Sequence, residues 1–172
     1  MLLKHEARGY HRRSWFVSMQ FLWPASVSAI VVVPLLFSGC TGGKALHQFV
    51  FEPAAIEPQT TRLTLDAGES LSFWNSLDVT YQTGTTLNFL ISVKPEQGTA
   101  VEVLCDALKP TTRFMTKTIT SGNVVNQSWK IAKMNCSYGP VDKTQAFTIT
   151  AVPQANGPVP LESDRIVMEI KG

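Results

Sequence analysis

Histidine is scarce in this sequence, and the common catalytic motifs are missing from it. Of its three histidines, only His47 lies after residue 40. A Ser-His-Asp or Cys-His arrangement in that part of the chain would therefore depend on His47. The same part has no Gly-x-Ser-x-Gly motif, no glycine-rich phosphate loop and no metal-ligand spacing. We therefore expect no enzymatic activity, no cofactor and no metal site.

Charged residues are also few, at 16% of the 172 residues. The total charge of +2 is misleading, because the first 39 residues alone carry +3 from Lys4, Arg8, Arg12 and Arg13 against Glu6. The remainder is therefore close to −1. A nearly neutral chain after residue 39 lacks the excess of basic residues that binds nucleic-acid phosphates. We therefore expect no nucleic-acid partner.

Long apolar runs are limited to one place. Residues 1–20 are basic and polar, residues 21–37 hold no charge, and Ser38-Gly39-Cys40 follows. This order is typical of an export signal with a small-residue cleavage site. The apolar run is at the short limit for spanning a bilayer, and Pro24 and Pro34 interrupt it. We predict a signal helix over residues 1–39 that is removed; the alternative is an uncleaved helical anchor.

The junction Leu36-Phe37-Ser38-Gly39-Cys40 resembles the lipobox of bacterial lipoproteins. The resemblance covers about the first 40 residues; Ser38 and Gly39 match it, whereas Phe37 replaces the usual leucine. It implies that a lipid is attached to the Cys40 thiol, that the chain is cut before Cys40 and that the new amino group is acylated. The implied partner is a membrane, held through covalent lipid. The absence of aspartate at position 41 implies the outer rather than the inner membrane of a Gram-negative envelope.

Two cysteines remain once Cys40 carries lipid. Cys105 and Cys136 allow a single pairing, and an exported domain meets an oxidising compartment. We predict a disulfide between them; the alternative is two free buried thiols.

Strict two-residue alternation of apolar residues dominates the chain from residue 61 onward. One example is the set Leu87, Phe89, Ile91 and Val93, and similar sets recur to Ile170, separated by turn residues. Such short strands with one wet face are typical of antiparallel sheets. The pattern changes parity between Trp129 and Met134, which indicates a bulge near Ala132 or Lys133, with Trp129 in the core.

We therefore predict an all-β antiparallel β-sandwich, of jelly-roll or immunoglobulin-like type, over residues 61–172. Residues 40–60 are expected to form the lipidated N-terminus and a tether. Leu46, Phe49 and Phe51 are apolar, and the alternative is that residues 46–52 add an edge strand to the sandwich.

Trp74 and Tyr81 are the candidate contact residues for an envelope protein or a glycan. Trp74 neighbours an inward-facing Phe73 and should point outward, and Tyr81 is near a turn. The alternative is that a neighbouring loop covers Trp74. The sequence favours a non-enzymatic binding or accessory module of the cell envelope. The alternative is an envelope hydrolase that acts on glycan through paired carboxylates such as Asp78 and Asp106.

Overall fold

The structure is a computed structural model that describes residues 43–53 and 56–172. The predicted signal helix and Cys40 lie outside the described residues. Within the described ranges, all regular structure is β, and none of it is a helix able to cross a membrane. Alternating apolar residues and closely spaced turns account for this result, and the all-β prediction is confirmed.

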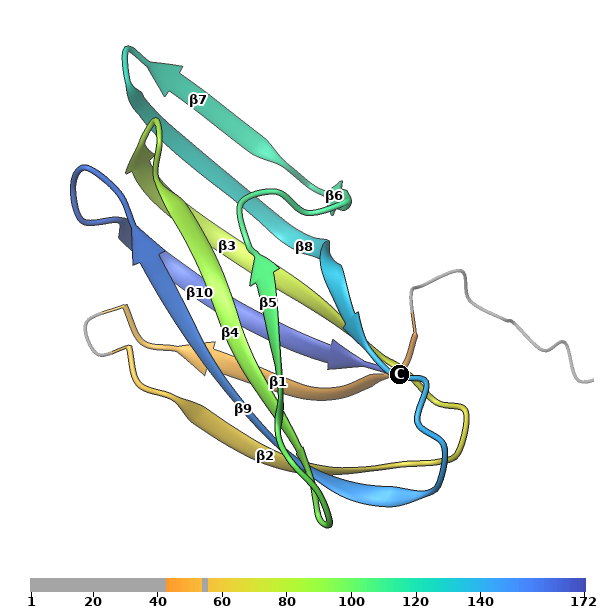
Figure 1. Ribbon diagram of the computed structural model, residues 1–172. Helices are drawn as coiled ribbons and strands as arrows, with labels where there is room; N and C mark the ends of the chain where they lie inside the picture. Colours follow the sequence, from red (N-terminus) through yellow and green to blue (C-terminus); the bar gives the residue numbers. More distant parts are fainter. Residues whose placement is uncertain (1–42, 54–55) are drawn as a thin grey trace, which may run out of the picture. The chain divides into compact units, whose positions relative to one another are not determined.

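The described residues form ten strands arranged in two antiparallel sheets (Figure 1). Sheet A has the order β1-β10-β3-β8-β6, with β7 also paired to β8, and sheet B has the order β2-β9-β4-β5. The strands are β1 (Ala45–Phe51), β2 (Gln59–Leu65), β3 (Leu71–Gln82), β4 (Thr86–Pro95), β5 (Val101–Asp106), β6 (Thr112–Phe114), β7 (Lys117–Ser121), β8 (Val124–Tyr138), β9 (Gln145–Asn156) and β10 (Glu162–Lys171).

The strands pair in nested order, from the two ends of the chain inward. The first strand, β1, pairs with the last, β10; β2 pairs with β9, β3 with β8, and β4 with β5. Of the two sandwich types expected, this nested pairing matches the jelly roll. Strands β6 and β7 are an addition between β5 and β8 that extends the margin of sheet A.

The core lies between the sheets and is formed by the alternating residues that the sequence marks as inward. Phe73, Phe89 and Phe147 are fully buried, and so is Trp129. The register between β3 and β8 shifts on both sides of the pairs that Ala132 and Lys133 form. The predicted bulge is therefore confirmed, and it lets Trp129 and Met134 face the same core despite their opposite parity.

The tether is shorter than predicted. Strand β1 pairs with β10 along its length, and Phe49 and Phe51 are each only 2% exposed. Placing the domain boundary at residue 61 was therefore wrong, because β1 and the start of β2 belong to the sandwich. The alternative of an edge strand over residues 46–52 is confirmed. The two phenylalanines explain it, since each gains roughly 1.5–3 kcal/mol when removed from water.

The predicted disulfide between Cys105 and Cys136 is present. It joins β5 of sheet B to β8 of sheet A, with the two Cα atoms 5.5 Å apart. The bridge therefore ties the two sheets together on the side of the sandwich where β5, β6 and β7 lie.

Candidate functional site

Trp74 lies on the outer face of sheet A, as expected, but its ring is covered. Its side chain is only 7% exposed, and the Nζ atom of Lys171 stands 4.4 Å from the ring centroid. The indole N–H donates a hydrogen bond to the Ser72 hydroxyl. The expectation of an exposed tryptophan was therefore wrong, because a side chain from the last strand covers a ring of β3 through a cation–π contact.

Tyr81 lies near the end of β3 on the face that turns toward sheet B. It is partly buried, and its hydroxyl donates a 2.7 Å hydrogen bond to Oε1 of Gln127. Burial raises the pKa of Tyr81 above 10.0; nearby Arg113 lowers this pKa and Asp106 raises it. The phenol is therefore neutral at physiological pH and serves as a hydrogen-bond donor within the fold.

A chain of polar contacts that the sequence does not reveal lies in the core, where β3, β8 and the end of β5 meet. The Trp129 indole N–H donates a 2.6 Å hydrogen bond to Oδ1 of Asn75, and Nδ2 of Asn75 donates to the carbonyl of Ala107. Asn75 and Trp129 are both almost fully buried, and the Arg113 guanidinium lies 5.6 Å from the Trp129 ring centroid. These buried groups have partners, so they hold β3, β8 and the end of β5 together rather than awaiting a ligand.

The carboxylates Asp78 and Asp106 belong to different sheets. Asp106 ends β5, and its Oδ1 accepts hydrogen bonds from the backbone N–H groups of Leu108 and Lys109. Asp78 on β3 borders a hollow of about 60 Å³ together with Glu162 and Asp164. This volume holds roughly two waters, too few to be replaced by a sugar ring. Among the described residues, no group of three or more histidines, cysteines and acids could hold a metal ion.

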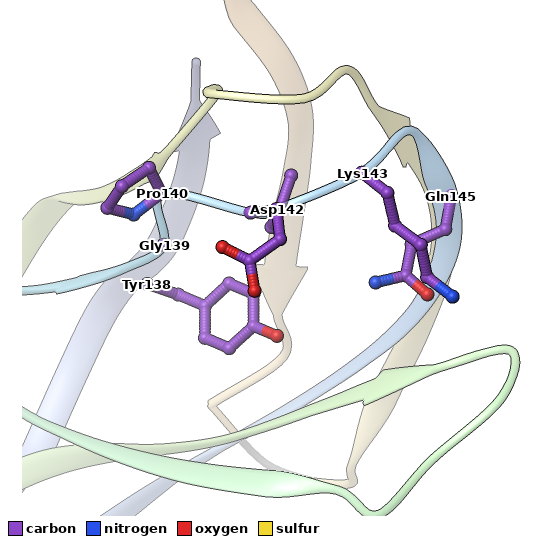
Figure 2. A pocket seen from close by; sticks show the side chains of 7 residues that line it. Tyr138, Gly139, Pro140, Asp142, Lys143 and Gln145 are labelled. Atoms are coloured by element: carbon purple, nitrogen blue, oxygen red, sulfur yellow. The ribbon is translucent and has the colours of Figure 1, made fainter.

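A polar cleft of about 450 Å³ lies along the loop from β8 to β9 (Figure 2). Its polar lining comes from Tyr138, Asp142, Lys143 and Gln145. Figure 2 shows Asp142 projecting toward the side on which Tyr138 lies, with Lys143 and Gln145 on the farther part of the loop. Asp142 and Lys143 are exposed, so their contacts with a solute would compete with water.

The loop that forms this cleft is held against the turn between β2 and β3. The backbone N–H of Val141 donates to the carbonyl of Glu69, and the N–H of Gly68 donates to the carbonyl of Val141. Gly139 has a φ of +103°, and a Cβ atom there would lie 2.9 Å from the Glu69 oxygen. Glycine is therefore required where the two loops meet.

Three of the exposed large apolar side chains among the described residues, including the most exposed one, lie on the β6–β7 edge, defined here as residues 112–121. Phe114 and Ile119 are each 52% exposed and Met115 is 75% exposed. Met115 has a positive φ of 53°, which is uncommon outside glycine and separates β6 from β7. Both strands pair with β8 on one side, and no strand of the described ranges pairs with β7 on the other.

Sequence reasoning missed this edge. Alternation places Phe114, Thr116, Thr118 and Thr120 in one polar strand, whereas the chain breaks at Met115 and turns Ile119 outward. A usable signal was the pair Phe114-Met115, which stands in a stretch with no other large apolar residue until Ile119. A group of exposed apolar residues on one edge is typical of an interaction surface.

No protein-family model, curated protein or solved structure matches this chain.

Proposed function

We propose that the protein is a lipid-anchored, non-enzymatic binding module of the bacterial cell envelope, and that its β6–β7 edge docks a partner protein. The resemblance of residues 36–40 to a lipobox supports the anchor. An acylated Cys40 would stand five residues before Ala45, where β1 begins. Thr41 after the cysteine favours the outer membrane over the inner membrane.

The position of the edge within the sandwich supports this role. Lys44 and Gly172 exchange backbone hydrogen bonds, so the chain enters the sandwich beside Ser72, which pairs with Lys171. The β7–β8 turn lies at the opposite end of β3, where Gln82 pairs with Val124. Ten residues of strand separate these ends, a length of roughly 33 Å. An anchor at Cys40 would therefore leave the outer end of β7 well away from the lipid surface.

The observation that carries the docking role is an unpaired edge strand with exposed Phe114, Met115 and Ile119. Proteins usually protect a free edge with charge, proline or a covering element, because an open edge pairs with other chains. In β7, Lys117 is the only charged residue. By comparison, the polar groups that the cleft offers at Asp142 and Lys143 are exposed to water.

The glycan-hydrolase alternative has less support. Asp78 and Asp106 are on separate sheets, and Asp106 is engaged by backbone N–H groups. The hollow beside Asp78 is too small for a sugar. Direct glycan binding through Trp74 is also less supported, because Lys171 covers its ring.

The anchor predicts a specific product of Cys40. Protein extracted from membranes should begin at Cys40 and carry the mass of a diacylglycerol with an additional acyl chain. The Cys40→Ser variant should lose the lipid mass and keep its leader, because the thiol is the attachment point. Mass spectrometry of the N-terminal peptide decides between these forms. An intact N-terminus in the wild type, or identical masses in the two proteins, would overturn the anchor.

The docking role predicts that Ile119→Ser reduces the recovery of partner proteins, whereas Val50→Ser does not. Affinity capture from solubilised membranes should recover a reproducible set of partners with the wild type. Ile119→Ser should reduce that recovery by about tenfold, because loss of a contact of this size costs roughly 1–2 kcal/mol. Quantitative mass spectrometry of the captured proteins measures the change.

Val50→Ser is the control for this experiment. Val50 is 53% exposed on β1, at the opposite margin of the same sheet, so its exposure matches that of Ile119. Val50→Ser should leave recovery unchanged. Equal recovery by all three proteins would remove the β6–β7 edge as the docking surface.

A further inference from the structure

The charges of the sandwich are distributed very unevenly along the chain. Residues 107–141 contain five basic residues and no acidic one. The near-neutral total after Cys40 therefore hides a basic segment and an acidic remainder. The five basic residues of this segment are Lys109, Arg113, Lys117, Lys130 and Lys133.

Most of these cations have no ionic partner in the described part of the chain. Lys109 approaches Asp106 at 3.9 Å, whereas Lys117, Lys130 and Lys133 form no ion pair with any described residue. All three of these lysines are exposed. They are free to bind an anionic group from outside.

Strand register places lysines and apolar residues on one face. Lys117 lies opposite Ser128, and Ile119 lies opposite Asn126. Ser128 and Asn126 alternate with the buried Gln127 and Trp129, so they face outward from sheet A. Residues directly opposite in an antiparallel pair share a face, so Lys117 and Ile119 also face outward.

The same face continues across β6. Phe114 lies opposite Ile131 and Thr112 lies opposite Lys133, and both partners flank the buried Ala132. Phe114 and Lys133 therefore share the outer face with Ile119 and Lys117. The outer face of this margin of sheet A therefore carries both apolar and basic side chains, and two of them, Lys117 and Ile119, lie on β7 itself.

We propose that the partner presents an extended, acidic polypeptide segment that adds to β7 as a further antiparallel strand of sheet A. Three features fit one occupant. The free side of β7 offers backbone donors and acceptors, Ile119 offers an apolar contact, and Lys117 with its neighbouring lysines selects acidic side chains. An anionic lipid surface would use the lysines and Ile119, but it would leave the free backbone groups of β7 without partners.

The register of such a complex follows from the β7 sequence. An antiparallel segment centred on Ile119 places an apolar residue opposite Ile119, hydroxyl residues opposite Thr118 and Thr120, and an acid opposite Lys117. The segment Ser-Thr-Val-Thr-Glu-Glu meets these requirements. Ser-Thr-Val-Thr-Lys-Lys keeps the backbone and apolar contact while reversing the charge.

This inference rests on the proposed docking role of the β6–β7 edge, and its test uses those two labelled peptides. The lipidated protein is held in phosphatidylcholine nanodiscs, and peptide binding is followed by fluorescence anisotropy. The acidic peptide should bind at least about tenfold more tightly than the basic one, with affinity falling as salt is raised. The triple variant Lys117→Glu, Lys130→Glu and Lys133→Glu should lose at least about tenfold in affinity for the acidic peptide and reverse the preference.

The triple variant Lys44→Glu, Lys94→Glu and Lys143→Glu is the charge-matched control, because these three exposed lysines lie outside β6, β7 and β8, and it should leave binding unchanged. Hydrogen exchange supplies the second measurement. Amides of residues 117–121 should gain protection when the acidic peptide binds, because a strand that pairs with β7 covers its free N–H groups.

Equal affinity for the two peptides, or binding without protection of β7, would overturn the acidic-strand inference. Binding of anionic phosphatidylglycerol vesicles that depends on the three lysines, without peptide binding, would assign this face to a lipid surface instead. These results are separable from the docking role. If Ile119→Ser abolishes capture of membrane proteins while neither peptide binds, the edge is a docking surface for a partner of different chemistry.

Discussion

A chain that begins at Thr60 will unfold with a free energy roughly 3–6 kcal/mol lower than that of a chain that begins at Thr41. The truncation removes β1, whose Phe49 and Phe51 are buried between the sheets. Each of these side chains contributes roughly 1.5–3 kcal/mol by leaving water, and their loss also exposes the β10 backbone. Denaturation with urea, followed by the fluorescence of the buried Trp74 and Trp129, measures the difference. A marginal sandwich losing this much would be largely unfolded, since whole domains are stable by only about 5–15 kcal/mol.

Two substitutions within β1 distinguish lost packing from a general effect of truncation. Phe51→Ala in the complete chain should cost about 3–5 kcal/mol, because it leaves a cavity beside Phe89, whose ring centroid lies 5.8 Å away. Val50→Ala changes the adjacent exposed residue and should stay within about 0.5 kcal/mol of the wild type. If truncation and Phe51→Ala both leave stability unchanged, residues 45–51 are a tether, and the β1–β10 pairing contributes nothing to the fold.

The sequence predicts well which residues of a strand face the core, because alternation within the strand itself carries that information. In β4, four alternating apolar residues from Leu87 to Val93 are all fully buried, as their period requires. The inward parity of Cys105 and Cys136 likewise predicts their proximity, since both strands face one core. Strand β1 is harder to predict, because its partner β10 lies more than 100 residues away and Pro53 marks a break soon after Phe51.

The surface of the sandwich depends on contacts that no local pattern contains. Trp74 has the outward parity that the alternation predicts, yet Lys171 covers it from a strand at the far end of the chain. Asn75 occupies an inward position and is polar, and only its bonds to Trp129 and Ala107 explain why. The β6–β7 edge depends on the backbone at Met115, where a positive φ is not expected for this residue type.

The disulfide is the second contact whose removal should have a large effect. The double variant Cys105→Ala and Cys136→Ala should lose about 3–4 kcal/mol in free energy of unfolding, because the bridge links residues 31 positions apart and restricts the unfolded chain. Alanine avoids placing a hydroxyl at the fully buried position of Cys105. Urea denaturation of the wild type with and without reductant provides the matching comparison, and both routes should give similar losses.

Counting thiols connects this test to the anchor. The chain has three cysteines. If Cys40 carries lipid and the bridge is closed, the unfolded, unreduced protein should accept no alkylating label, and the reduced protein should accept two. A third label after reduction would mean that Cys40 is free, which contradicts the anchor but leaves the bridge intact. Two labels before reduction would mean that Cys105 and Cys136 are free thiols. In that case the double alanine variant should cost only the packing of two small buried groups, roughly 1–2 kcal/mol, rather than the larger loss expected from releasing β5 from β8.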